Sequence, residues 1–415
     1  GGLAGSLCAL VLRSRGAQPT LFDAGRRGLG GRLRAGGAQF LRPSEETSPF
    51  ALVLRQLEGH GLVAPWQGRF GVLGARGGGF LPKEIINSVQ LGGLRRSAGS
   101  DSVVGEGPGE APGDGGDFCG FATGGTSSST IYVGTPSMGE LCTGICRLGG
   151  VDDVRLGARV VDARFDPGQR TWELVCESAG GGREVSEAFH ALVIASHNPA
   201  LAAGVVGRLG GTDEAQSERL GNLSAALQEL RERHTAPLLT LSAAFPAGSL
   251  SERVPFDAAA CPTSSDLQLL VREASKPGPL GARVSDGEEL WTAISTSRLA
   301  RKLLGDRGVA ESGAWDAEAA ASELVERLRQ HLTPFFEEGG ADPPAPLRAS
   351  ARRWRAGLCL RTLGLKEDAV TLEPWRLGVC GDFLRWYPTP LEAAGVSGLE
   401  AGERVAAWLS EQPAS

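Results

Sequence analysis

The first residues of the chain have the types and the spacing of a dinucleotide-binding turn. Gly2 and Gly5 lie three residues apart at the start of an apolar segment, and Asp23 follows Gly2 by 21 residues. Glycines let the backbone approach a pyrophosphate, a helix start offers N–H groups to it, and an acid about 20 residues on accepts hydrogen bonds from ribose hydroxyls. We therefore predict that these three residues bind a dinucleotide. A chance glycine turn is the alternative, because 61 residues are glycine.

A helix and a strand must position these residues. The apolar residues of Ser6–Arg15 recur at helical spacing, and Gly16 follows where a helix can end in a left-handed residue. Pro19–Asp23 has the length and composition of a buried strand that ends in the carboxylate. The first strand and the first glycine of the dinucleotide fingerprint are missing. We therefore expect a fragment of a longer chain, whose upstream residues form an apolar strand ending in glycine.

Helices and strands alternate at both ends of the chain, and its middle is mixed. Apolar runs at Ala191–Ala195 and Arg376–Cys380 predict buried parallel strands. The order of elements predicts the α/β class: a Rossmann-like domain without its first strand, interrupted by an inserted α+β domain on an antiparallel sheet. The other predicted strands are Val154–Val161, Thr171–Cys176, Pro237–Phe245 and Leu290–Thr296, and the predicted helices are Ser137–Arg147, Leu223–Arg233, Ala317–Leu332 and Gly395–Leu409.

The chain of 415 residues is long enough for two domains. We predict that residues 1–50, 130–200 and 366–415 form the discontinuous dinucleotide-binding domain, and that 51–91 and 201–365 form a substrate domain. Twelve of the glycines lie between Gly92 and Gly125, among serine, proline and acidic residues. That composition predicts a flexible surface insertion over residues 92–129.

Composition argues against several other classes of protein. A formal charge of −6 argues against a nucleic-acid binder, and no apolar run reaches the length of about 20 residues that a membrane span needs. The eight cysteines and five histidines show no metal-site spacing and no catalytic triad, so no metal is predicted. We expect reduced cysteines in an intracellular protein, cytoplasmic or organellar.

Motifs along most of the chain resemble a known family. Gly30-Gly31-Arg32, shortly after Asp23, resembles the flavin-containing amine oxidase superfamily, in which Gly-Gly-Arg follows the ribose-binding acid. The later motifs resemble the renalase-like FAD-dependent oxidoreductases and occur in the order of that family. They are Gly37-Ala38-Gln39-Phe40, Gly61 to Trp66, Val133 to Met138, Ala191 to Pro199, Arg353-Trp354-Arg355, Gly381-Asp382 and Leu391 to Gly398.

The resemblance implies FAD as the cofactor and assigns residues to it. Gly30, Gly31 and Arg32 would approach phosphate. The other implied cofactor contacts are Asp382 at the ribityl or phosphate part, Val160 at the adenine, and the helix start near Gly395. Trp354 would cover the substrate as the candidate catalytic residue. The alternatives are a solvated Arg32, a turn acid at Asp382, an ordinary strand residue at Val160 and core packing for Trp354.

Departures from the family pattern lie mostly on the expected substrate side. Arg352 stands where relatives often have histidine, Ala356 replaces a tyrosine, and Ile294 stands at the place of another histidine. Ala393 replaces a glycine on the cofactor side. These changes leave the identity of the substrate open.

The function implied is that of an FAD-dependent oxidoreductase, which passes a substrate hydride to flavin N5. Oxygen or another acceptor would reoxidise the flavin, and the partner would be a small-molecule donor, amine-like or dihydronicotinamide-like. The isoalloxazine ring does the redox chemistry, which fits a sequence without an evident acid–base pair. A non-catalytic dinucleotide-binding or degenerate homologue is the alternative.

Overall fold

The computed structural model describes residues 1–74, 79–82, 129–177, 182–278, 287–309, 315–337 and 340–411. The predicted insertion 92–129 lies outside these residues except for Ser129. The helices are α1 (Leu3–Ser14), α2 (Pro49–Gly59), α4 (Leu141–Leu148), α5 (Ala200–Val206), α6 (Glu214–Arg233), α7 (Ser297–Val309), α8 (Ala317–Leu332) and α9 (Pro390–Ser410). A 3₁₀ helix, η1 (Gly31–Gly36), follows the first strand, and another, η2 (Glu273–Ser275), lies in the second half.

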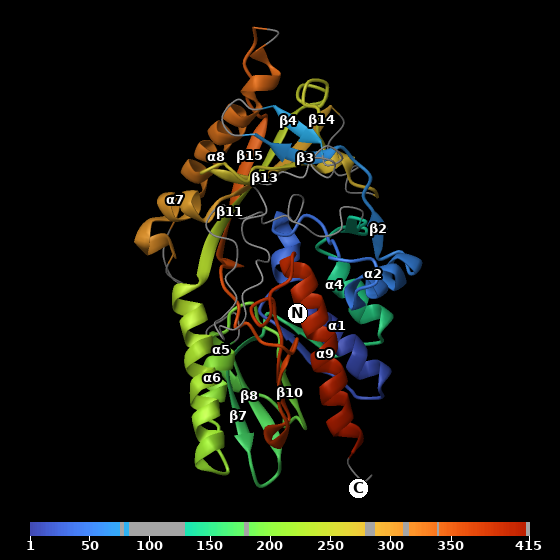
Figure 1. Cartoon of the computed structure of the whole chain (residues 1–415), viewed down its shortest axis with the longest axis vertical. Helices are drawn as coiled ribbons and strands as arrows, with labels where there is room; N and C mark the ends of the chain where they lie inside the picture. The colour runs from blue at the N-terminus through green and yellow to red at the C-terminus, as the bar shows by residue number, and fades with distance from the viewer. Residues whose placement is uncertain are drawn as a thin grey trace, which may run out of the picture.

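The strands form one large sheet and several small ones (Figure 1). They are β1 (Leu21–Asp23), β2 (Val63–Pro65), β3 (Phe70–Leu73), β4 (Phe80–Pro82), β5 (Tyr132–Gly134), β6 (Val154–Leu156), β7 (Arg159–Asp166), β8 (Thr171–Glu177), β9 (Arg183–Val185), β10 (Leu192–Ile194), β11 (Thr235–Pro246), β12 (Ala258–Ala260), β13 (Leu267–Arg272), β14 (Glu288–Ser295), β15 (Arg348–Cys359), β16 (Val370–Leu372) and β17 (Leu377–Val379).

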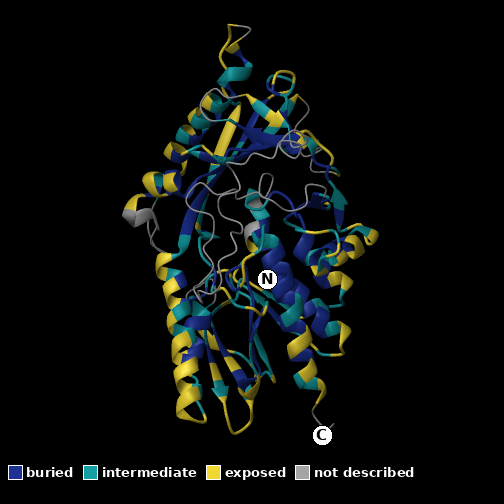
Figure 2. Cartoon of the chain, viewed as in Figure 1, coloured by how far each residue is buried: buried dark blue, intermediate teal, exposed yellow. Residues whose placement is uncertain are grey.

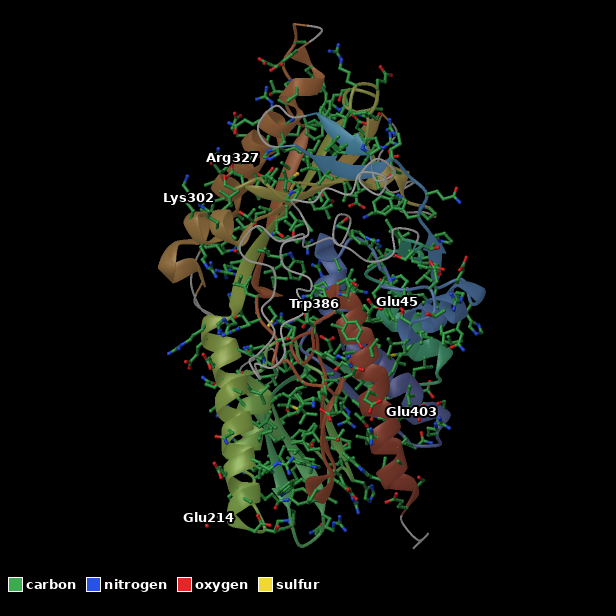
Figure 3. All side chains as sticks on the ribbon, viewed as in Figure 1. Glu45, Glu214, Lys302, Arg327, Trp386 and Glu403 are labelled. Carbon is green, nitrogen blue, oxygen red and sulfur yellow. The ribbon has the colours of Figure 1, made fainter. Side chains whose placement is uncertain are left out.

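Parallel strands occur in two small sheets beside α1 and α9. β1 pairs in parallel with β6, and β10 pairs in parallel with β17, whose other edge carries β16. α1 packs on the second sheet: Ala4, Cys8 and Leu12, one turn apart, share a cluster with Ala191 and Val193. At the surface Glu403 of α9, labelled in Figure 3, forms an ion pair with Arg15, the C-cap of α1. These contacts place the start of α1 at the carboxyl end of β10.

The large sheet has seven strands in the order β15-β11-β14-β13-β12-β3-β4. Its two faces differ because side chains alternate along a strand. On β11, Leu239, Leu241 and Ala243 are buried in a cluster beneath α7 and α8, whereas Thr240 and Ser242 face away from those helices and line a groove. Figure 2 shows exposed residues on the outer sides of the helices and buried ones between them and the sheet.

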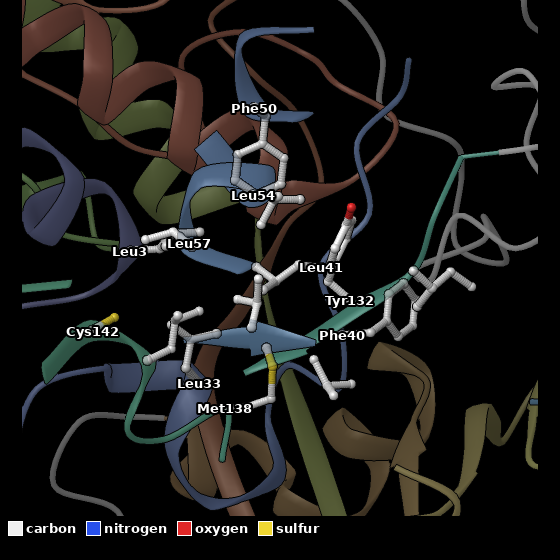
Figure 4. Packing of buried hydrophobic residues seen from close by; sticks show 14 of the residues in the cluster. Leu3, Leu33, Phe40, Leu41, Phe50, Leu54, Leu57, Tyr132, Met138 and Cys142 are labelled. Carbon is white, nitrogen blue, oxygen red and sulfur yellow. The ribbon is translucent and has the colours of Figure 1, made fainter. Parts of the chain in front are cut away.

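A second apolar cluster joins η1, α2 and α4. Leu33, Leu41, Phe50 and Met138 belong to it, with side chains from segments far apart in the sequence (Figure 4). The backbones of Leu41 and Tyr132 also form an antiparallel bridge, so two segments far apart in the sequence meet in this cluster. This cluster fixes the loop that contains η1.

Several sequence predictions are confirmed and others need correction. α8 covers Ala317–Leu332 as predicted, with Asp316 as its N-cap. The predicted strand Val154–Val161 is two strands, because the left-handed Gly157 (φ +70°) breaks it into β6 and β7. The predicted helix Ser137–Arg147 begins only at Leu141, and α9 begins at Pro390, five residues before Gly395.

A buried carboxylate joins three strands of the large sheet and gives a test of stability. Asp257 accepts hydrogen bonds from the Arg69 backbone (2.8 Å) and side chain, and it pairs with Arg272 (2.6 Å). Burial raises the pKa of Asp257, but the hydrogen bonds of Arg69 and the charge of Arg272 outweigh it and hold the pKa below its ordinary value. The ionised carboxylate therefore stabilises the fold above about pH 4, and this contribution is lost as pH falls through the lowered pKa.

We expect Asp257→Asn to lower the free energy of unfolding by about 2 kcal/mol at neutral pH. The difference from the unaltered protein should shrink as the pH falls below about 4, where the carboxyl of the unfolded chain takes up a proton, and it should vanish once the pH is below the lowered pKa of the native carboxyl. Urea unfolding at several pH values measures both effects. Asp342→Asn is the matched control, because Asp342 is exposed. An equal loss at every pH would contradict the assignment.

Within the described ranges, every helix is too short or too polar to cross a membrane. In the same residues no cluster of three or more His, Cys, Asp or Glu side chains could hold a metal ion.

Candidate functional site

A long groove of about 2560 Å³ separates the parallel strands from the polar face of the large sheet. Gly1 and Gly2 line it, as do the residues of β1 and β10, and it reaches β11 and β15. In open α/β sheets, ligands bind at the carboxyl ends of the strands, so this end of the groove is the expected ligand site.

The predicted glycine turn lies at the start of α1. Gly2 is the N-cap, the first turn of α1 contains no acidic residue, and a Cβ at Gly2 would meet nothing within 4 Å. The first N–H groups of a helix have no partner within it, so they are available to a ligand in this open space. Gly5 has a different role: a Cβ there would approach that of Ala195 to 3.2 Å, so Gly5 lets α1 pack closely on the end of β10.

Asp23 lies beside this turn at the end of β1. A Cβ at Gly1 would lie 1.7 Å from its carboxylate, which shows how closely the two segments approach. The Oδ1 atom accepts a hydrogen bond from the backbone of Gly25 (2.6 Å), and the Asp23 side chain is only 12% exposed. The structure thus brings Gly2 and Asp23 into one place, as the spacing predicted.

The glycine-arginine loop folds over the same turn. Gly30 and Gly31 both have left-handed φ angles (+118° and +43°), and the Gly30 N–H donates to the carbonyl of Gly1 (2.7 Å). The side chain of Arg32 lies outside the described part of the structure. Arg34 lines the groove and is held by the Leu29 carbonyl (2.8 Å) and the Glu140 carboxylate (2.7 Å). Sequence reasoning missed Arg34, because nothing distinguished it from the other arginines of this loop.

The remaining predicted cofactor residues differ in position. Val160 on β7 and Asp382 after β17 both line the groove, and Asp382 is 7% exposed. Gly395 does not line it: a Cβ there would lie 2.5 Å from Phe50, so this glycine lets α9 pack against α2. Leu391 and Ala394 are the residues from the start of α9 that reach the groove.

The opposite wall of the groove belongs to the large sheet. Trp354 on β15 lies there, and its indole N–H donates to the Thr240 hydroxyl on β11 (2.6 Å). Arg352 and Ala356 also line this wall. Ile294 does not, because it is buried in the apolar cluster that also contains Leu33 of η1. Trp354 is therefore both a lining residue and hydrogen-bonded within its own sheet.

A buried ion pair in this wall was not predicted. The Lys276 ammonium donates to the Glu273 carboxylate (2.8 Å) and to the Gln39 side chain (2.6 Å), and Thr292 donates to the other Glu273 oxygen (2.7 Å). Gln39 in turn donates to the Gly36 carbonyl (2.7 Å). The chain of bonds clamps the η1 loop to the large sheet, and no local motif reveals it because Gln39 and Lys276 are 237 residues apart.

The thiols near the groove are not poised for nucleophilic chemistry. Burial raises the pKa of Cys8 well above its ordinary value and that of Cys380 to about 12. Both thiols are protonated at neutral pH, and a protonated thiol is a poor nucleophile. Neither of these two thiols is therefore a candidate nucleophile for the groove.

The mixed α/β fold is similar to that of several solved structures of oxidoreductases. A putative protoporphyrinogen oxidase from Exiguobacterium sp. 255-15 superposes with a TM-score of 0.59 at 11% identity, covering 99% of this chain and 98% of that one. Cyclohexylamine oxidase from Brevibacterium oxydans IH-35A gives 0.58 at 14% identity with the same coverage. An oxidoreductase from Methanosarcina mazei gives 0.57 at 13% identity, covering 97% of each chain.

At such low identity the likeness establishes the fold alone. No protein-family model matches the sequence, and no curated protein matches it. What these oxidases act on is therefore a property of those proteins.

Proposed function

We propose that the chain is an FAD-dependent oxidoreductase of the renalase and amine-oxidase type. One observation carries this proposal: the Asp23 carboxylate lies at a glycine turn, in the same groove as the polar wall of a second sheet. Such a groove can hold a dinucleotide at one end and a substrate at the other. The superposition on three oxidoreductases over nearly the whole chain supports the same proposal.

The residues present fit FAD. The start of α1 at Gly2 would receive the pyrophosphate, and Asp23 would accept hydrogen bonds from ribose hydroxyls. Gly30 and Gly31 let the backbone of the next loop approach a phosphate, and Asp382 presents a carboxylate farther along the groove. When bound, FAD would supply the redox chemistry by accepting a substrate hydride at N5, with reoxidation by oxygen or another acceptor.

The chain's own residues would bind and orient the donor. Trp354 and Thr240 offer a flat ring and a hydroxyl from the sheet, and the Lys276–Glu273 pair fixes the η1 loop against that sheet. A wall held this rigidly can position a substrate and exclude water, which is what a cofactor-driven hydride transfer requires of the protein. The donor would be a small molecule, amine-like or dihydronicotinamide-like.

The proposed division of the chain follows the sheets. Every strand of the seven-stranded sheet falls within residues 51–91 or 201–365, the proposed substrate domain. The glycine turn, β1, β10, β17 and α9 belong to the proposed Rossmann-like FAD domain. We also propose an intracellular protein, consistent with the seven described cysteines, all of which are free.

The purified protein is expected to be yellow, with a flavin absorbance spectrum that bleaches under dithionite and returns in air. Colourless protein should acquire that spectrum on incubation with FAD. A preparation that binds no FAD in either way would overturn the proposal. Tightly bound flavin that no donor reduces would favour the alternative, a non-catalytic homologue. The residues Arg352 and Ala356, which depart from the family pattern in the wall of the groove, motivate that alternative.

A further inference from the structure

Arginines are concentrated on one strand of the groove wall. β15 carries Arg352, Arg353 and Arg355 on either side of Trp354, and all four residues line the groove. In the described sheet β15 is an edge strand, paired with β11 (Figure 1). Arg352 is exposed, and it stands where the family that the sequence resembles often has histidine. The charge at this position is therefore a property of this chain rather than of that family pattern.

Arg352 shares a face of the sheet with the polar residues of the groove. Because side chains alternate along a strand, Arg352 and Trp354 lie on the same side, about 7 Å apart along β15. The register of the sheet pairs Arg352 with Thr240 of β11, and the Thr240 hydroxyl accepts a hydrogen bond from the Trp354 indole (2.6 Å). A guanidinium, a hydroxyl and a fixed aromatic ring therefore adjoin one another on the groove wall.

Two of these arginines have no counter-charge in the described part of the chain. Within those residues no ion pair or hydrogen bond engages the guanidinium of Arg352 or of Arg355. The contrast is Arg348, which lies on the same strand outside the groove and pairs with Glu288 of β14. The unpaired guanidinium groups are thus those that line the groove.

The third arginine shows how closely the positive charges are placed. The guanidinium of Arg353 lies over the ring of Trp315, with 5.6 Å between its central carbon and the ring centroid. Burial and the charge of Arg355 both lower the pKa of Arg353. A like charge has this effect only at short range, so the arginines of β15 act on one another.

The acidic side chain of this wall does not balance them. Among the described residues of the large-sheet wall, Glu273 is the one carboxylate that lines the groove, and it already accepts hydrogen bonds from Lys276 (2.8 Å) and Thr292 (2.7 Å). A simple ammonium group would find no unpaired acid here. The positive charge is also local, because the whole chain carries a formal charge of −6. A groove wall of this kind attracts anions.

We propose that the arginines of β15 bind an anionic group of the electron donor, a carboxylate or a phosphate, with Arg352 as the principal contact. This inference deepens the proposed function and rests on it, since the donor is that of the proposed oxidoreductase. A guanidinium donates two parallel hydrogen bonds to an oxyanion, and the ring of Trp354 covers a flat part of the same molecule. Arg352 selects the donor by its charge and takes no part in the hydride transfer.

The proposal restricts the two donor types. A dihydronicotinamide-like donor meets it when it carries a phosphate, and an amine-like donor meets it when it also carries a carboxylate. A simple amine meets it in neither way.

Small aromatic probes test this requirement without any turnover. Benzoate and phenyl phosphate are anions, whereas benzamide and benzylamine offer the same ring with a neutral and a cationic group. In titration calorimetry both anions are expected to bind at least about 10-fold more tightly than benzamide, and benzylamine more weakly still. The more tightly bound anion identifies the group of the donor as carboxylate or phosphate. Equal affinities for benzoate and benzamide would overturn the proposal.

Two variants of β15 locate the anion site. Arg352→Gln is expected to weaken benzoate binding about 10-fold or more and to leave benzamide binding unchanged. Arg348→Gln is the matched control, because it removes an arginine of the same strand that does not line the groove, and it should change neither affinity. Both side chains are exposed, so urea unfolding should show that both variants fold. Equal benzoate affinities of the two variants would contradict the assignment of Arg352.

The same titrations, with and without FAD, separate this inference from the proposed function. Benzoate binding that depends on Arg352 in a chain that takes up no FAD would support the anion site and overturn the oxidoreductase. A yellow protein in which Arg352→Gln lowers the affinity for FAD but not for benzoate would assign Arg352 to the cofactor. That result would overturn the inference while the proposed function stands.

Discussion

Replacing Asp23 by alanine is expected to weaken FAD binding about 10- to 100-fold and to leave the purified protein nearly colourless. The carboxylate is almost buried, is fixed by the Gly25 N–H, and lies beside the glycine turn. Hydrogen bonds from ribose hydroxyls to a fixed, charged acceptor are each stronger than neutral ones, so their loss accounts for an effect of this size. The measurement is the dissociation constant of FAD, from quenching of its fluorescence.

Two further variants separate binding from folding. Asp23→Asn retains an oxygen acceptor for Gly25 but loses the charge, so its FAD affinity is expected between those of Asp23→Ala and the unaltered chain. Asp153→Ala removes a carboxylate that bonds Thr20 and Arg155 but does not itself line the groove, and its FAD affinity should be unchanged. If Asp23→Ala binds FAD as tightly as Asp153→Ala does, the site lies elsewhere in the groove.

The glycine turn was predictable from sequence because all of its signals are local. Gly2, the helix and Asp23 lie within 23 residues, and the intervening helix and strand place the two ends together by geometry alone. The same holds for α8, because its apolar stripe and its N-cap, Asp316, both lie in one short segment of the sequence.

The wall of the groove was not predictable in the same way. Lys276 and Glu273 lie three residues apart, which is the spacing of an ordinary ion pair on the surface of a helix. In the structure both are buried, and Gln39 and Thr292 from distant segments bond to them. Trp354 was found through a motif, but its partner Thr240 depends on the register of β15 against β11. Only the folded sheet determines which polar residues share its face.

Gly395 illustrates why a glycine motif can be misread. A glycine at the start of a C-terminal helix serves either a ligand that approaches the backbone or a helix that packs against it. The neighbouring side chain of Phe50 decides between the two, and it comes from α2, some 345 residues earlier (395 − 50). The motif located α9 correctly but not the residues of that helix that reach the groove.

Gly398→Ala is expected to lower the free energy of unfolding by about 3 kcal/mol, because α1 and α9 cross in contact at this point. A Cβ at Gly398 would lie 2.2 Å from the carbonyl oxygen of Ala4 and 2.8 Å from its Cα. These are backbone atoms, which cannot turn away as a side chain can. One turn further, a Cβ at Gly402 would meet the Cys8 carbonyl at 3.0 Å, so the two helices have no room to slide.

Gly221→Ala provides the matched control, since it makes the same change in a helix where a Cβ meets nothing within 4 Å. Alanine there is expected to raise the free energy of unfolding by about 0.5–1 kcal/mol, because it is the better helix former. Urea unfolding of both variants, followed by tryptophan fluorescence, should thus give opposite signs. Gly398→Ala should also weaken FAD binding, because displacing α1 moves the turn at Gly2 away from Asp23. Equal stability of Gly398→Ala and Gly221→Ala would show that α1 and α9 do not cross in contact. The packing of α9 on α1 would then not be what holds the turn at Gly2 beside Asp23.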